Sequence, residues 1–163
     1  MGETITSVYI ITPKTKAIIS HESSYYKSLI YETGRERHSI HNPTQIIDNN
    51  CLIFGASHEG IKKSVKDILR ASSKLPIPVI PQEGVYMIPT ASFKNKDCVW
   101  ISYHQIASYE QQGDKTYISF LDGTGIYAST TESSFDMQYK RTSQLIVHLN
   151  RSVIFGRAAF PST

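Results

Sequence analysis

The first third of the chain carries short apolar runs separated by polar turns, a pattern that predicts β-strands. Pro13 and Lys14 provide one such turn. Three runs rich in β-branched and aromatic residues fit strands: Thr6–Thr12, Ala17–Ser20 and Tyr25–Tyr31. The stretch from Glu32 to His41 is polar apart from Ile40 and predicts a turn or loop.

Helical spacing of the apolar residues begins after Asn42. This residue is a favourable N-cap, Pro43 suits the first turn of a helix, and Gly55 is typical of a helix end. Between them, four apolar side chains recur at helical spacing: Ile46, Ile47, Cys51 and Phe54. We therefore predict a helix here.

The stretch Ser57–Ser72 fits a helix better than a strand, because alternation is poor there and the apolar residues share one side of a helical wheel. That side holds Ile61, Val65, Ile68 and Leu69. The adjacent side holds four cations within about 100° of one another: Lys62, Lys63, Lys66 and Arg70. A strand remains the alternative.

Prolines divide the next part of the chain and confine its strands to sheet edges or to the segments between them: Pro76, Pro78, Pro81 and Pro89. Two further runs fit strands: Val85–Ile88 and Cys98–Tyr103. A hairpin follows, with strands Ile106–Tyr109 and Tyr117–Leu121 around a turn at Gln111–Asp114. Asp122-Gly123 is a strong turn signal and leads to a last strand over Gly125–Ala128.

The most regular helical pattern lies near the end of the chain, where Ser133 or Ser134 can serve as N-cap. One face is lined by Phe135, Tyr139, Thr142, Leu145, Ile146, Leu149 and Val153. The opposite face is basic and polar, with Lys140, Arg141, Gln144, His148 and Arg151. The pattern as a whole predicts a single α+β domain, mainly antiparallel β-strands with two or three amphipathic helices.

Composition is that of a globular protein: 163 residues, 40% apolar and 19% charged. The two cysteines, Cys51 and Cys98, form no short metal or redox motif, so we expect buried, reduced thiols in a cytoplasmic protein. A disulfide between them is the alternative. Apolar runs are too short to span a membrane, so we expect no membrane partner.

The net charge of +3 is unevenly distributed. Residues 1–55 sum to zero, residues 56–75 to +3, residues 76–139 to −4 and residues 140–163 to +4. A solvated helix face explains any one basic cluster. Two clusters in one small domain favour an anionic partner, and nucleic acid is the commonest of these.

Complete catalytic and metal motifs are missing from the sequence, so we expect no enzyme, no cofactor and no metal. The segment Gly55–Gly60 has one residue too many for a nucleophile elbow and lacks the lysine placement of a phosphate loop. His38 and His41 form a close pair without the further ligands that a structural zinc site needs. Trp100 lies between apolar residues and is expected in the core.

Several blocks of residues, in order and spacing, resemble the ComK family of bacterial competence transcription factors. The first block is Ile47-Asp48-x-x-Cys51-x-x-Phe54-Gly55-x-Ser57-x-x-Gly60-x-Lys62. It is followed by Ser72-x-Lys74-x-Pro76-Ile77-x-Val79-x-Pro81, Pro89-Thr90, Cys98-x-Trp100-Ile101-Ser102, Phe120-x-x-Gly123 and Ser134-Phe135-x-x-Gln138-x-x-Arg141-Thr142. The resemblance is best over residues 43–150, within a ComK-like domain at residues 1–152, and fades in a divergent tail at residues 153–163.

The resemblance implies an activator of DNA-uptake genes that binds double-stranded DNA at paired A/T-rich boxes, largely through the minor groove. It also implies a homo-oligomer and turnover through a MecA-type adaptor and a Clp protease. The divergent tail makes a shortened homologue, folded but inactive on DNA and acting only as a protein-interaction module, the alternative.

The candidate DNA contacts follow from the two basic clusters. The first cluster comprises Lys62, Lys63, Lys66, Arg70 and Lys74, and the second comprises Lys140, Arg141 and Arg151. Arg141 belongs to both the basic face and the family motif. For the same reason it is also a candidate for an ion pair with Asp136 or Glu132.

Overall fold

Nine strands form two antiparallel sheets in the computed structural model, which describes residues 8–92 and 95–156. The larger sheet has the order β3-β2-β1-β6-β5-β4 and the smaller one the order β7-β8-β9. The strands of the larger sheet are β1 (Thr15–Ser20), β2 (Ser28–Glu32), β3 (Arg35–Ser39), β4 (Ile77–Ile80), β5 (Val85–Pro89) and β6 (Val99–Ser102). Those of the smaller sheet are β7 (Ile106–Gln112), β8 (Lys115–Phe120) and β9 (Gly125–Ala128). The α+β class is confirmed.

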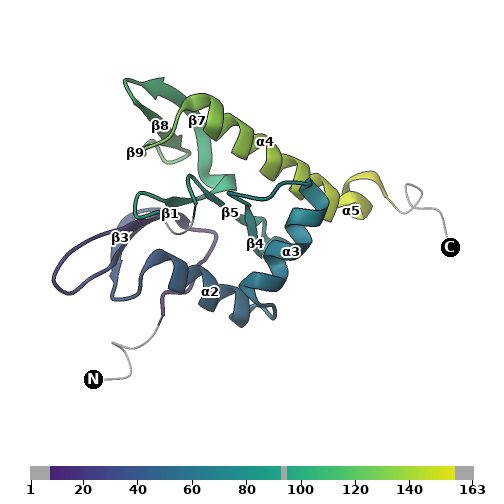
Figure 1. Ribbon diagram of the computed structural model, residues 1–163, viewed down its shortest axis with the longest axis horizontal. Helices are drawn as coiled ribbons and strands as arrows, with labels where there is room; N and C mark the ends of the chain where they lie inside the picture. Colours follow the sequence, from purple (N-terminus) through teal and green to yellow (C-terminus); the bar gives the residue numbers. More distant parts are fainter. Residues whose placement is uncertain (1–7, 93–94, 157–163) are drawn as a thin grey trace.

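The helices are α2 (Pro43–Ile53), α3 (His58–Leu69), α4 (Glu132–Leu149) and α5 (Arg151–Phe155), and the short 3-10 turns are η1 (Pro81–Glu83) and η2 (Tyr103–Gln105). In Figure 1, α2 lies below the larger sheet, while α4 and the smaller sheet lie above it. α3 stands beside the sheet and reaches α4.

The central strands of the larger sheet are buried on both faces. Trp100 in β6 pairs with Ile18 in β1, and both face α2 with Ile46 and Cys51. Their strand neighbours face the opposite way, toward the smaller sheet and Phe135 of α4. Burial on both faces explains why these strands form continuous apolar runs without alternation.

Several predicted elements are confirmed. Asn42 caps α2 through a capping box, in which its side chain accepts from the Gln45 amide and the Gln45 side chain accepts from the Asn42 amide. The stretch after Ser57 is a helix, and β4, which contains Pro78, is an edge strand. Trp100 is buried, as are both cysteines, which are free thiols.

The predicted loop between Glu32 and His41 is wrong, because it contains strand β3 and closes a hairpin with β2. Gly34 adopts a φ of 87° in the tight turn, which suits glycine. Four of the five β3 residues are exposed at the sheet edge, so the strand carries no apolar alternation.

The predicted strand over Thr6–Thr12 is also wrong within the described residues, since Val8–Thr12 forms no ladder; Thr6 and Ser7 lie outside them. The Asn50 side chain replaces a strand partner. Its Oδ1 accepts from the Ile11 amide at 2.8 Å, and its Nδ2 donates to the Tyr9 carbonyl at 2.8 Å. Similarly, the predicted strand over Tyr25–Tyr31 begins only at Ser28.

The last helix differs from the prediction at both ends. Thr131, rather than Ser133 or Ser134, is its N-cap, with Oγ1 accepting from the Ser134 amide at 3.2 Å. At the other end Asn150 breaks the helix, and its Nδ2 donates to the Ile146 carbonyl at 2.8 Å. Val153 therefore lies on the separate helix α5 and is 82% exposed rather than part of the core face.

Candidate nucleic-acid interface

Helix α3 places a row of cations on the outside of the molecule. Ser57 caps the helix by accepting from the Gly60 amide at 3.0 Å, and Val65 is fully buried on its inner side. Lys63 and Lys66 are exposed, and Lys62 lies at the margin of the buried side. The amphipathic pattern of this segment thus orients the lysines toward solvent.

The connection from α3 to β4 carries the next two cations in an unusual backbone conformation. Arg70 ends α3 with a φ of 52°, and Lys74 has a φ of 53°. These are the two non-glycine residues with positive φ in the described chain. Left-handed backbone is unfavourable for residues with a Cβ, so the surrounding structure must hold it in place.

Gln138 of α4 supplies that support. It is buried, and its Nε2 donates to the Lys74 carbonyl at 2.5 Å and to the Pro89 carbonyl at 3.3 Å. Its Oε1 accepts from Arg141 Nη1 at 3.3 Å. One buried amide therefore fixes both the Lys74 turn and the Arg141 side chain, and it joins the two basic clusters of the sequence.

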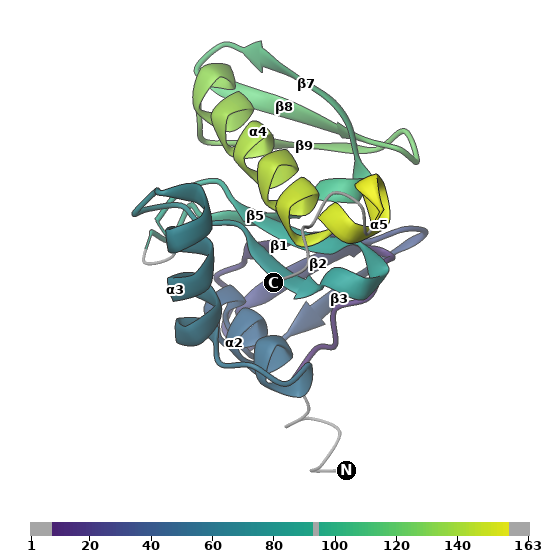
Figure 2. The ribbon, with the colours of Figure 1, turned by 90° about the vertical axis from the view of Figure 1, so that its right-hand side faces the viewer.

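Packing of α3 against α4 brings these groups together (Figure 2). Val65, Leu145 and Tyr86 form a small apolar core between the helices and the larger sheet. We call the resulting surface the basic face; its members are Lys62, Lys63, Lys66, Arg70, Lys74 and Arg141.

Helix α3 also carries two acids, Glu59 and Asp67, so cations outnumber acids on the basic face without being alone there. Lys62 pairs with Glu59 at 2.9 Å, and this hydrogen bond holds the pKa of the exposed Glu59 carboxyl below its usual range. In the described part of the chain, no ion pair involves Lys63, Lys66 or Arg70. Such cations keep their charge available to an external anion.

A small cavity of about 160 Å³ opens within the basic face. Lys62 and Lys74 line it together with the hydroxyl-bearing Ser72 and Ser73, and buried Trp100 contributes to its wall. Cations and hydroxyl groups are the donors that bind phosphate oxygens in protein–DNA interfaces. The arrangement can therefore accept a backbone phosphate.

Two predicted contacts are not part of the basic face. Lys140 pairs with Asp136 at 2.8 Å, and Asp136 also accepts from the Tyr109 hydroxyl at 2.6 Å, which turns this pair toward the smaller sheet. Arg151 lies on α5 with its guanidinium 5.4 Å from the Phe155 ring centroid. Lys140 and Arg151 therefore contact other groups than Gln138, and their role in DNA binding stays a prediction.

The anticipated ion pair of Arg141 with Asp136 or Glu132 is not formed. Asp136 is occupied by Lys140, and Glu132 accepts from the Gln111 amide at 2.8 Å. Sequence reasoning missed Gln138 as the link. A glutamine within the otherwise apolar stripe of the helix was the available signal.

Other candidate chemistry is limited in residues 8–92 and 95–156. No group of three or more histidine, cysteine or acidic side chains there could hold a metal ion. Burial, with a contribution from Asp48, raises the pKa of the Cys51 thiol to about 11, and the side chain packs in the core. No helix in this part of the chain combines the length and apolar character needed to cross a bilayer.

Comparison with known proteins agrees with the motifs. The family model described as ComK protein matches residues 6–153. The chain belongs to the ComK family. Over 104 residues it is 32% identical to the competence transcription factor of Bacillus subtilis (strain 168), which covers 63% of this chain and 54% of that relative. This ComK-family chain therefore aligns with about half of the relative's length, and no solved structure matches it.

Proposed function

We propose that this ComK-family chain is a DNA-binding transcriptional activator of competence genes, acting in the cytoplasm without enzymatic activity. The observation that carries the proposal is the junction at Gln138, which links Lys74 and Arg141 into one basic face with α3. Family membership supports the role in transcription, and the unopposed cations support a polyanion as the partner.

The basic face suits backbone contacts and entry into a narrow groove. Lysines on α3 project from a rigid helix, so they can neutralise phosphates at fixed spacing. Arg141 is held by Gln138 before DNA arrives, which limits the entropy lost on binding. A/T-rich tracts have a narrow minor groove with enhanced negative potential, where arginine and lysine insert favourably. We therefore propose recognition of A/T-rich boxes largely through the minor groove.

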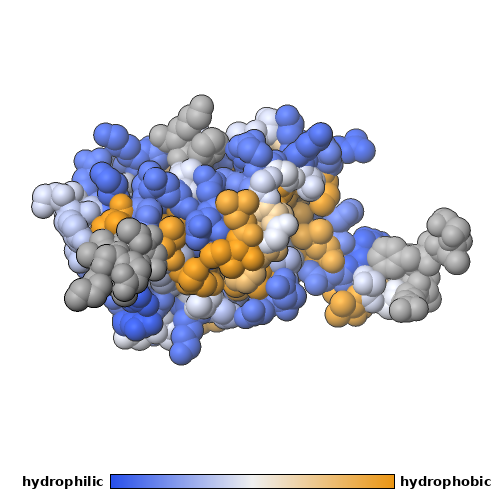
Figure 3. Space-filling view, turned by 90° about the horizontal axis from the view of Figure 1, so that it is seen from below, coloured by the Kyte–Doolittle hydropathy of each residue, from blue (hydrophilic) through white to orange (hydrophobic). Residues whose placement is uncertain are grey.

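We also propose that the active form is a homo-oligomer. Figure 3 shows apolar side chains gathered on the underside of the molecule, where α2 ends. Leu52, Ile53 and Phe54 are 63%, 49% and 39% exposed at that end. Adjoining apolar side chains on a surface are typical of contact with another protein chain. Repetition of the basic face along DNA would multiply a modest charge per subunit.

Fluorescence anisotropy tests the proposal with two duplexes of equal length at about 0.15 M salt. One duplex carries two A/T boxes one or two helical turns apart, and the other is scrambled and G/C-rich. We expect a clear preference for the first, which Lys62→Gln with Lys66→Gln, or Arg141→Gln, removes. Lys115→Gln, at the exposed first residue of β8, is the matched control. Equal and weak binding to both duplexes would contradict the proposal.

The exposed apolar helix α5 favours a second candidate, a protein-interaction module that does not act on DNA. Val153, Ile154 and Phe155 are 82%, 51% and 54% exposed. The family resemblance adds a MecA-type adaptor and a Clp protease as partners. Adaptor-dependent degradation of the chain together with equal, weak binding to both duplexes would favour this candidate.

A further inference from the structure

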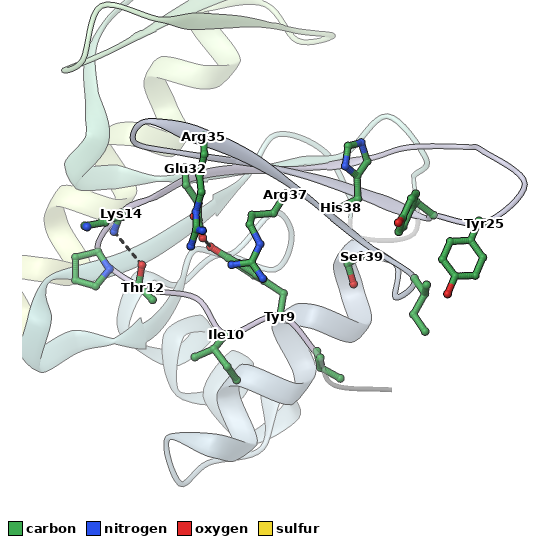
Figure 4. Close-up of a pocket in the computed structure, with 14 residues that line it drawn as sticks. Tyr9, Ile10, Thr12, Lys14, Tyr25, Glu32, Arg35, Arg37, His38 and Ser39 are labelled. Atoms are coloured by element: carbon green, nitrogen blue, oxygen red, sulfur yellow. Dashed lines mark hydrogen bonds and ion pairs between the residues drawn. The ribbon is translucent and has the colours of Figure 1, made fainter. Parts of the chain in front are cut away.

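A large groove lies between the edge strand β3 and the segment Val8–Lys14 (Figure 4). Its volume of about 920 Å³ is at the upper end of the size range of ligand sites. β3 is one edge of the larger sheet and β4, beside α3, is the other. Five strand spacings of about 4.8 Å separate these edges by roughly 24 Å, so the groove is distinct from the basic face.

The charge of the groove favours an anion. Three permanent cations line it, Lys14, Arg35 and Arg37, against one carboxylate, Glu32. Glu32 is buried and already bound, because it accepts from Arg35 Nε at 2.7 Å and from the Tyr9 hydroxyl. Arg37 lies 5.8 Å from the Tyr9 ring centroid and forms no ion pair with any residue in the described ranges.

The opposite end of the groove is aromatic. Figure 4 places Tyr25 and His38 at the end away from Lys14 and Arg35. Tyr25 is 53% exposed and Tyr26 is 38% exposed, with ring centroids 4.8 Å apart, and the Tyr26 and His38 rings are 4.9 Å apart. Ser23 fixes this turn in advance, since its Oγ accepts from the Tyr26 amide at 2.8 Å.

We infer that this groove binds single-stranded nucleic acid. A basic track that leads to exposed aromatic rings is the arrangement that binds single strands, with phosphates on the cations and bases stacked on the rings. A duplex keeps its bases inside its own stack and offers no base face to Tyr25. An acidic peptide would use the cations but would leave the aromatic end without a matching group.

The test uses the full chain and a fluorescent oligothymidylate of about 16 nucleotides, the longest site expected for one small domain. The wild type binds this probe, and Tyr25→Ser weakens binding roughly tenfold because one stacked base is lost. Arg37→Gln and Lys14→Gln each remove about one phosphate contact, so the binding constant depends less steeply on salt concentration in each variant. All three positions are exposed, and circular dichroism verifies that the variants fold.

Two controls separate this groove from the basic face. The groove variants leave the affinity for the A/T duplex unchanged, whereas Lys62→Gln with Lys66→Gln weakens duplex binding and leaves oligothymidylate binding intact. Failure of the wild type to bind oligothymidylate would overturn the inference. So would an equal loss of duplex affinity in the groove variants, or Arg37-dependent binding of polyglutamate in place of the oligonucleotide.

Discussion

Cations in two regions of this molecule have opposite surroundings. On the basic face, Lys63, Lys66 and Arg70 have no acid partner among the described residues. Around the smaller sheet, Lys16 pairs with Asp122 at 2.7 Å and Lys140 pairs with Asp136 at 2.8 Å.

The difference indicates a structural role for the paired lysines and a binding role for the cations of the basic face. Lys16 of β1 connects the larger sheet to the turn after β8, and Lys140 pairs with Asp136 within α4. Unopposed cations raise the local potential and attract a polyanion. Arg141 and Lys140 are neighbours in the sequence but belong to different regions, because the first is held by Gln138 and the second by Asp136.

The largest effect is expected from removing the unopposed cations together. Changing Lys63, Lys66 and Arg70 to Gln should weaken duplex binding roughly a hundredfold at low salt, because three phosphate contacts are lost. Each lost contact should also lower the slope of the log binding constant against the log salt concentration by about 0.9. Anisotropy titrations over a series of salt concentrations measure both values. An unchanged slope of the log binding constant against the log salt concentration would contradict the assignment of these residues to DNA contacts.

The neighbouring pair in α4 sharpens the comparison. Arg141→Gln should weaken binding of the A/T duplex roughly tenfold, the range of a single arginine contact. Lys140→Gln removes the same charge from the adjacent position and should leave the affinity almost unchanged, because Asp136 already neutralises it. Equal losses in the two variants would show that only total charge matters.

Gln138→Leu tests the link between the clusters. It leaves the carbonyls of Lys74 and Pro89 without this donor, so the free energy of unfolding should fall by about 1–3 kcal/mol. Duplex affinity should fall severalfold as Arg141 loses its fixed position. Gln144→Leu, at an exposed position of the same helix, is the control for both urea unfolding and anisotropy.

The paired region predicts a dependence of stability on acid pH. The hydrogen bond from Lys16, with those from Thr124, lowers the pKa of Asp122 to about 2. Because the folded pKa lies below the unfolded value of about 3.9, this stabilisation is present above pH 4 and is lost as the pH falls toward 2. Urea unfolding at several pH values should show that the free energy of unfolding falls less at acid pH in Asp122→Asn than in the wild type. Duplex binding at neutral pH should be unchanged.

The smallest effect concerns the strained turn. Lys74→Gly should raise the free energy of unfolding by about 0.5 kcal/mol, since glycine relieves left-handed strain but loses more backbone entropy. The same change should weaken duplex binding a few-fold. Lys63→Gly, in the α3 interior, should instead destabilise by about 1 kcal/mol. Stabilisation without loss of duplex affinity would show that Lys74 does not contact DNA.

Local signals were enough to predict much of the fold. The cap at Asn42, the cationic side of α3 and the hairpin before Asp122 all depend on residues close in sequence. Strand β3 was missed because its side chains are exposed at a sheet edge and show no apolar alternation. The β-branched and aromatic residues of Val8–Thr12 predict a strand, but its backbone bonds to the side chain of the distant Asn50, which local sequence does not show.

The same distinction between local signals and long-range contacts applies to the candidate site. The two basic clusters were visible in the charge distribution, but their junction was not, because Gln138 meets Lys74 across 64 residues. Lys140 and Arg141 look equivalent in the sequence, and only tertiary packing assigns Asp136 to one of them. The tyrosine and arginine groove was also missed, since its charges cancel within residues 1–55.

Amide hydrogen exchange of the chain with and without the A/T duplex tests the central claim most directly, because it locates the contact. The account predicts slower exchange in residues 58–76 and around Arg141, with no change in the hairpin of β7 and β8. Protection of the hairpin, or no protection of α3, would contradict the assignment of the unopposed cations to DNA.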